Sequence, residues 1–152
     1  MFCDIKPQLE NPAVLRILAL SVYEESLERA AQKAQEYRED EAHHCYGWVR
    51  NGVLFGVCAF AVHADKVEIT SIAVDKTLQR GGIGRAMINA LREHFALREH
   101  FALREHFALR EHPPLPIEAE TDDDAVGFYC NCGFEVTAIE KHGTRRWICI
   151  LR

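Results

Sequence analysis

Apolar residues in the middle of the chain recur with the two-residue period of β-strands. Residues 45–50 and 53–62 are rich in β-branched and aromatic side chains, and Asn51-Gly52 between them is typical of a tight hairpin turn. The segment 63–65 then turns the chain into a third β-rich run, residues 66–75. These segments predict three consecutive antiparallel strands.

Helical patterns precede this meander. Residues 2–6 favour an opening strand, and Asn11-Pro12 is expected to cap the helix that follows. A second helix is expected from about Ser26, with a polar stretch over residues 27–40. We expect it to lie largely exposed, because its few apolar residues are Leu27, Ala30, Ala31 and Ala34.

The C-terminal third predicts three more strands, over residues 117–120, 134–140 and 146–151. Asp122 is expected to be the N-cap of a short helix between the first two of them. The order of elements predicts one α+β domain over residues 1–152, with α/β/α layers and a mixed, mostly antiparallel sheet of about six to seven strands.

A glycine-dense turn links the third strand to the next helix, with the sequence Gln79-Arg80-Gly81-Gly82-Ile83-Gly84. Glycines at 81, 82 and 84 allow positive φ and close approach of a ligand to the main chain. The helix that follows presents unpaired amides and a positive dipole end, which suits a pyrophosphate. Two other phosphate motifs do not fit, because no Lys follows Gly84 and the glycine order is not that of a dinucleotide-binding fold.

The spacing Gln-x-x-Gly-x-Gly after a strand that ends Ile72-Ala73-Val74 resembles the acetyl-CoA-binding motif of the GNAT superfamily of N-acetyltransferases. The resemblance implies that the backbone of Ile72 to Val74 would meet the pantetheine and the thioester, and that the amide of Val74 could support the oxyanion. The pyrophosphate would be held by Gln79, Arg80, Gly81, Gly82, Ile83, Gly84 and Arg85.

A second motif of the same family is similar to residues 125–134. The pattern Ala-x-x-Phe/Leu-Tyr-x-x-x-Gly-Phe is matched by Ala125, Phe128, Tyr129, Gly133 and Phe134. The resemblance implies that Tyr129 is the general acid that protonates the departing CoA thiolate. The chain departs from the family at the helix entry, often Asn there and Asp122 here, where a carboxylate facing the cofactor would repel its phosphates.

The implied activity is N-acetyl transfer from acetyl-CoA to a primary amine of a small molecule or peptide, by direct attack in a ternary complex. The amine must lose a proton first, because alkylamines are mostly protonated at pH 7. Glu68 is our candidate base, since it shares a strand face with Ile72 and Val74; Glu120 or a water chain are the alternatives. A non-catalytic acyl-CoA sensor, or an oligomerisation module with this fold, is the other function considered.

Composition narrows the class of protein. A net charge of -5 argues against nucleic-acid binding and mildly favours cationic partners such as amines. No apolar stretch approaches the roughly 18 residues of a membrane span, and no signal peptide is recognised, so a cytoplasmic location is expected. The six cysteines are expected to be reduced, and no metal site is expected, because the repeated histidines at spacing six spiral around a helix.

One segment breaks the pattern: Leu-Arg-Glu-His-Phe-Ala recurs in tandem over residues 91–112. Its residues all tolerate a helix, which favours one long helix over 84–112. Such a rod would be about 43 Å long, whereas a six-residue strand spans about 20 Å and residues 113–116 reach back at most about 14 Å. The helix must therefore break, or copies must loop out, or residues 117–152 must complete the sheet of a second chain; we favour a domain-swapped homodimer.

Overall fold

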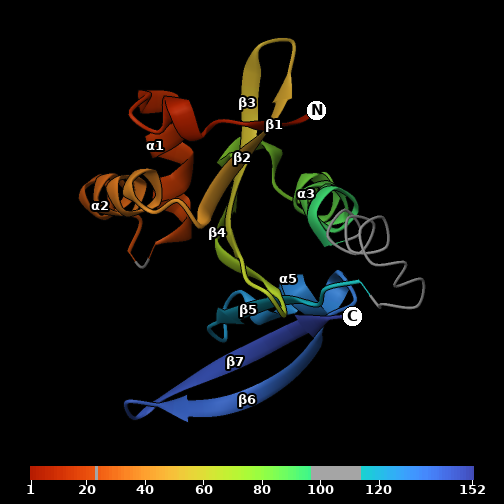
Figure 1. The fold of residues 1–152 in the computed structure, drawn as a ribbon. Coiled ribbons are helices and arrows are strands. Elements are labelled where there is room, and N and C mark those ends of the chain that lie inside the picture. The colour runs from red at the N-terminus through yellow and green to blue at the C-terminus, as the bar shows by residue number, and fades with distance from the viewer. Residues whose placement is uncertain (23, 97–113) are drawn as a thin grey trace. The chain divides into compact units, whose positions relative to one another are not determined.

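The computed structural model describes residues 1–22, 24–96 and 114–152 (Figure 1). Its seven strands form a mixed sheet in the order β1-β2-β3-β4-β5-β7-β6. By their contacts the residues form two compact units, Met1–Val62 with Thr70–Ala90, and His63–Ile69 with Leu91–Arg152. Strand β4 begins in the second unit and ends in the first, and each unit is described in turn.

The first unit contains the N-terminal half of the chain. Its strands are β1 (Phe2–Asp4), β2 (His43–Arg50), β3 (Val53–Val62) and the end of β4 (Val67–Val74). Its α-helices are α1 (Pro12–Leu18), α2 (Leu27–Glu39) and α3 (Ile83–Leu91), whose last residue belongs to the second unit, and short 3-10 turns occur at Lys6–Gln8, Ala19–Ser21 and Lys76–Leu78.

The expected hairpin is present. Strand β2 pairs antiparallel with β3, with Arg50 opposite Val53, and β1 pairs antiparallel with β2. Asn51 and Gly52 connect β2 to β3 with φ of 51° and 75°, the two positive values that a type I′ turn requires. The Asn-Gly pair therefore sets the register of this hairpin.

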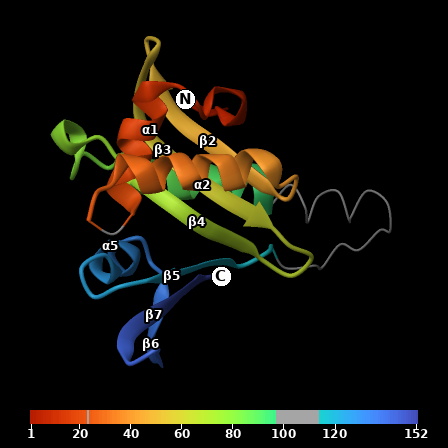
Figure 2. The same ribbon diagram turned by 90° about the vertical axis from the view of Figure 1, so that its left-hand side faces the viewer.

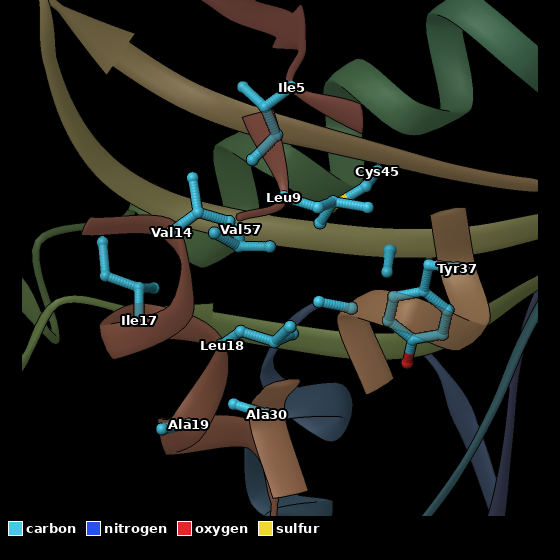
Figure 3. Packing of buried hydrophobic residues seen from close by; sticks show 12 residues of the cluster. Ile5, Leu9, Val14, Ile17, Leu18, Ala19, Ala30, Tyr37, Cys45 and Val57 are labelled. Carbon is cyan, nitrogen blue, oxygen red and sulfur yellow. The ribbon is translucent and has the colours of Figure 1, made fainter. Parts of the chain in front are cut away.

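Helices cover both faces of these strands, α1 and α2 on one side and α3 on the other (Figure 1); Figure 2 shows α2 in front of the strands. Asn11 and Ser26 cap α1 and α2 by accepting hydrogen bonds from the amides of Ala13 and Arg29. The main apolar cluster lies under α1 and α2 (Figure 3) and includes Ile5, Leu9, Val14, Ile17, Leu18, Ala30, Ala34, Tyr37, Cys45 and Val57.

Helix α2 is largely exposed, as its sequence predicts, but its buried stripe differs from the apolar residues noted there. Leu27 is 63% exposed, and the stripe is Ala30, Ala34 and Tyr37, spaced by four and three residues. The sequence pattern had not singled out Tyr37 as a core residue.

The second unit contains the start of β4 with β5 (Ile117–Thr121), α5 (Val126–Asn131), β6 (Glu135–Lys141) and β7 (Thr144–Leu151). Strand β5 runs parallel to β4 over three residue pairs, Val67–Ile69 with Ile117–Ala119, and antiparallel to β7. Strands β6 and β7 form a hairpin whose turn residues, His142 and Gly143, have φ of 53° and 76°.

Two expectations about helices need correction or qualification. Helix α5 begins at Val126 with Ala125 as its N-cap residue and no side-chain cap; Asp122 instead accepts a hydrogen bond from the Ala125 amide in the preceding turn. The first repeat copy ends α3 and forms a π-helical turn, Arg92–Ala96, while the copies from Leu97 onward lie outside the described residues. The described helices are short, and the long helix over 84–112 is not shown.

Candidate functional site

The glycine turn begins where β4 ends. Asp75 follows the strand, and its carboxylate accepts hydrogen bonds from the amide and the hydroxyl of Thr77, at 3.0 and 2.8 Å. The bond from the Thr77 amide contributes most to lowering the pKa of Asp75. This carboxylate is thus occupied in capping the 3-10 turn.

Gln79 closes the next part of the turn. Its side-chain amide nitrogen donates to the carbonyl oxygen of Val74, at 3.1 Å. The residue expected to contact the pyrophosphate therefore also ties the turn back to the end of the strand.

The backbone of this turn enters the left-handed region at two positions. Arg80 has φ of 69° and Gly82 has φ of 84°, whereas Gly81 and Gly84 lie outside this region. A Cβ on Gly81 would lie 3.3 Å from the carbonyl oxygen of Leu78, so glycine is used there for close approach. Both uses suit a turn whose main chain faces a ligand.

Helix α3 starts directly after the turn. The amide of Ala86 donates to the carbonyl oxygen of Gly82, at 2.9 Å. The amides of Ile83 and Gly84 come before this bond and therefore belong to the first turn of the helix, where amides have no acceptor in the helix itself. Ile83, Met87 and Ile88 are buried, whereas Arg85 is exposed at the same helix end. The buried side chains hold α3 in place. The positive end of the helix dipole and the arginine side chain both lie next to the turn.

A close packing contact under α3 was not expected from the sequence. A Cβ on Gly56 of β3 would lie 2.9 Å from Cε of Met87 and 3.2 Å from the carbonyl oxygen of Ala73. Glycine at this position lets the helix and the end of β4 approach β3 closely. An isolated glycine within a β-run is the signal that could have found it.

In the second unit, Glu68 lies on β4 with its carboxylate 3.2 Å from Nε2 of His63, and both side chains are half-exposed. The residue opposite it in the parallel ladder is Glu118, which pairs with Lys66 at 3.6 Å. Glu68 is therefore accessible to solvent and adjoins a histidine.

Glu120 has a different environment. Its carboxylate accepts hydrogen bonds from Lys141 at 3.1 Å and from Arg146 at 3.2 Å. These contacts, that of Lys141 first, lower the pKa of Glu120. The two cations favour the ionised carboxylate and make it a weaker proton acceptor.

Tyr129 lies on α5 and is 5% exposed. Its ring makes edge-on contacts with Phe128 and Phe134, with centroids 5.1 and 5.2 Å apart. Gly133, with φ of 90°, reverses the chain after the helix so that the amide of Phe134 reaches the carbonyl oxygen of Tyr129, at 3.0 Å. The three matched motif positions thus act together to fix the tyrosine.

The entry to α5 is bound to the last hairpin, a link the sequence did not reveal. Both carboxylate oxygens of Asp123 accept from Arg145, each at 2.9 Å, and one also accepts from the indole nitrogen of Trp147, at 2.7 Å. The pKa of Asp123 is lowered, chiefly by the bond from Arg145.

The expected site residues fall into two groups. Ile72 to Val74 and the run Gln79 to Arg85 belong to one unit and form a continuous strand, turn and helix start. Glu68 and Tyr129 belong to the other unit.

The family model of the acetyltransferase (GNAT) family matches residues 11–134. The chain belongs to this family. The match includes the strand, the glycine turn and the tyrosine helix, and the chain is therefore a GNAT-type acyltransferase. Acetyl-CoA is the co-substrate of the family.

Solved structures share the fold at low identity. A Desulfovibrio desulfuricans protein assigned to the GNAT family is 18% identical with a TM-score of 0.72, covering 100% of this chain and 98% of that chain. The ribosomal-protein-S18-alanine N-acetyltransferase of Escherichia coli is 19% identical with a TM-score of 0.65, covering 99% and 90%. A Bacillus subtilis acetyltransferase in complex with CoA is 21% identical with a TM-score of 0.56, covering 88% and 86%. No curated protein matches the chain.

Two further observations concern other kinds of site. Within residues 1–22, 24–96 and 114–152, no helix is both long and apolar enough to cross a membrane. All six cysteines are free in this structure, and burial raises the pKa of Cys45 to about 12.

Proposed function

We propose that this GNAT protein transfers the acetyl group of acetyl-CoA to a primary amine by direct attack within a ternary complex. The observation that carries the proposal is the closed turn after β4. Gln79 ties it to Val74, Gly82 adopts a left-handed φ, and α3 begins at the next residue. This arrangement presents main-chain amides to an anion.

The fit to coenzyme A rests on the chemistry of this turn. Its amides and the exposed arginines Arg80 and Arg85 suit a pyrophosphate, and the carboxylate of Asp75, which precedes the turn, is directed to Thr77. The ladder between β4 and β5 ends at Ile69, so it does not use the backbone of Ile72 to Val74. That backbone would hold the pantetheine and thioester.

Glu68 is the proposed base. It accepts a proton from the ammonium form of the amine, whose nitrogen then forms a bond to the thioester carbon. His63, whose Nε2 lies 3.2 Å from this carboxylate, would pass that proton on to solvent. Glu120 suits this role less well, because Lys141 and Arg146 already hold its carboxylate.

Tyr129 is the proposed acid. When the carbon–sulfur bond breaks, its hydroxyl proton passes to the thiolate, since a phenol pKa of about 10 is of the same order as that of a thiol. The attacking nitrogen then carries one proton more than the amide product, and transfer of that proton through solvent to the phenolate restores Tyr129. Packing between Phe128 and Phe134 limits the positions that the ring can adopt. The amide of Val74 would stabilise the negative charge on the carbonyl oxygen.

The acceptor is tested with a panel of amines. Structures similar in fold are named for acetylating the alanine of ribosomal protein S18, aminoglycosides and spermidine. We therefore compare thiol release from acetyl-CoA with peptide N-termini, aminoglycosides and polyamines. The net charge of -5 favours a cationic acceptor.

Two results separate this activity from a sensor without turnover. Calorimetric binding of coenzyme A together with amine-dependent thiol release supports the transferase. Binding without turnover for any acceptor contradicts it, and absence of binding refutes the assignment of the turn. The cytoplasmic location and the domain-swapped homodimer stay predictions.

A further inference from the structure

A hydroxyl pair is buried beneath α2. The phenol oxygen of Tyr37, on α2, and Oγ of Ser71, on β4, are joined by a hydrogen bond. Tyr37 is 2% exposed and Ser71 is 7% exposed, and the tyrosine ring belongs to the apolar cluster of the first unit (Figure 3). The two residues lie far apart in sequence, so this bond links a helix to a strand.

The helix end that carries Tyr37 is held firmly. The ring stacks on His43 with centroids 4.7 Å apart, and Nδ1 of His43 lies 2.9 Å from the carboxylate of Asp40. Nζ of Lys6 donates to the carbonyl oxygens of Asp40 and His43, at 2.8 and 2.7 Å. These contacts fix the tyrosine relative to β2, so its hydroxyl is a fixed point for β4.

Ser71 immediately precedes the strand segment 72–74. Side chains alternate along β4, and Ser71 and Ala73 face the cluster under α1 and α2. Gln79 holds the carbonyl oxygen of Val74 at the other end of the segment. The main chain of Ile72 to Val74 is therefore fixed on both sides by side-chain hydrogen bonds.

Stability alone does not explain a polar pair at this place. Replacing both partners of a buried hydrogen bond with apolar groups of similar shape is often nearly neutral, whereas removing one partner is costly. A Phe and Ala pair would fill the same core. A directional bond, unlike apolar packing, fixes the position of the strand along its own axis.

We propose that Tyr37 and Ser71 are positioning residues for acyl transfer. Their hydrogen bond holds β4 so that the main chain of Ile72 to Val74 presents its polar groups to the thioester in the geometry of the reaction. This inference rests on the proposed function. It concerns the chemical step, because the expected grip on the pyrophosphate lies in the turn from Gln79 onward.

The test compares Tyr37→Phe, Ser71→Ala and the double variant. Each single variant is expected to lower kcat about tenfold, since small misplacement of reacting groups is costly. The stoichiometry of coenzyme A binding should stay the same and its affinity should fall by a smaller factor than kcat, because the turn expected to hold the pyrophosphate is intact and only the pantetheine contacts are affected. In the double variant, stability against urea should return toward wild type while kcat stays low.

Controls remove equivalent hydroxyls elsewhere in the same unit. The control variants are Tyr46→Phe and Ser21→Ala. Tyr46 lies on β2, and Ser21 lies after α1, where its hydroxyl donates to the carbonyl oxygen of Leu18. Both should retain wild-type kcat. Stoichiometry of coenzyme A binding reports the folded fraction, so a variant that only unfolds is recognised.

The outcomes separate the two proposals. Suppose that the wild type is active and that the double variant regains wild-type kcat. The loss in each single variant then comes only from the buried hydroxyl that has lost its hydrogen-bond partner, and the positioning role is refuted. Wild-type kcat in either single variant refutes it as well. If the wild type binds coenzyme A but acetylates no amine, the proposed function fails, and the positioning role falls with it.

Discussion

The side-chain amide of Gln79 lies 3.1 Å from the carbonyl oxygen of Val74, and this bond closes the turn between β4 and α3. The bond ties the residue that opens the glycine motif to the last residue of the strand before it. A turn pinned in this way presents its amides without first having to be ordered by the ligand, which lowers the entropic cost of binding.

Replacing Gln79 with Ala should therefore weaken coenzyme A binding. The loss of one neutral hydrogen bond corresponds to about 1 kcal/mol, or roughly a fivefold increase in Kd. Titration calorimetry measures this directly. Gln35→Ala is the matched control, because Gln35 donates to Glu39 on the exposed side of α2. An unchanged Kd for Gln79→Ala would show that the turn keeps its shape without the bond.

Gly82 and Gly143 offer a second matched pair. Both have positive φ, 84° and 76°, and a Cβ on either would meet nothing within 4 Å, so an alanine introduces backbone strain alone. Each substitution should cost about 1–2 kcal/mol of unfolding free energy. Only Gly82→Ala should also weaken coenzyme A binding, because Gly143 lies in the β6–β7 turn. Equal Kd values for the two variants would remove Gly82 from the binding site.

Local rules in the sequence predict much of this fold. Asn51-Gly52 specifies its hairpin because both residues tolerate positive φ, and Asn11 and Ser26 specify helix starts because each accepts a hydrogen bond from the first turn. The tyrosine motif is predictable for the same reason, since Gly133 permits the reversal that joins Phe134 to Tyr129.

What the sequence did not predict depends on contacts between distant residues. The pattern of the polar helix α2 does not indicate that Tyr37 is buried, because its hydrogen-bond partner, Ser71, lies on β4, and β2 and β3 come between them in the sequence. The bonds from Asp123 to Arg145 and Trp147 likewise join segments that only the folded hairpin brings together. Glycine alone did not specify positive φ in the turn, because the non-glycine residue Arg80 adopts it and Gly81 does not.

Substitution of Tyr129 by Phe tests the acid role. The ring contacts with Phe128 and Phe134 should persist, so stability should change little while kcat falls by about 10²-fold or more. Affinity for coenzyme A should stay within about twofold of wild type. Steady-state kinetics with calorimetry on the same preparation provide both values. If kcat is retained, the thiolate is protonated by another group or by water.

The homodimer predicted from the hexapeptide repeat is tested by sedimentation at micromolar concentration. Strand β5 pairs with β4 of the same chain, and exchange would replace this pairing with the same one between two chains. We expect a dimer for the full chain and a monomer after deletion of two repeat copies, residues 97–108. A monomeric full chain would exclude exchange of residues 117–152.

Glu120 makes stability depend on pH in a defined direction. Hydrogen bonds from Lys141 and Arg146 lower the pKa of Glu120 in the folded chain below its usual value. Its stabilising effect is therefore present above the unfolded pKa and is lost as pH falls through the folded pKa.

Glu120→Gln should therefore be less stable than wild type at pH 7, and the difference should shrink in acid. The difference in unfolding free energy at pH 7 should be less than about 1 kcal/mol, because about a third of the Glu120 side chain is exposed and solvent screens its pair with Lys141. Urea unfolding at several pH values measures the difference. Lys141→Met supplies the control, because Lys141 is the main cause of the shift, and the effect of Glu120→Gln should be smaller in that background. A difference that is constant from pH 7 to pH 3 would show that the carboxylate acts through packing rather than charge.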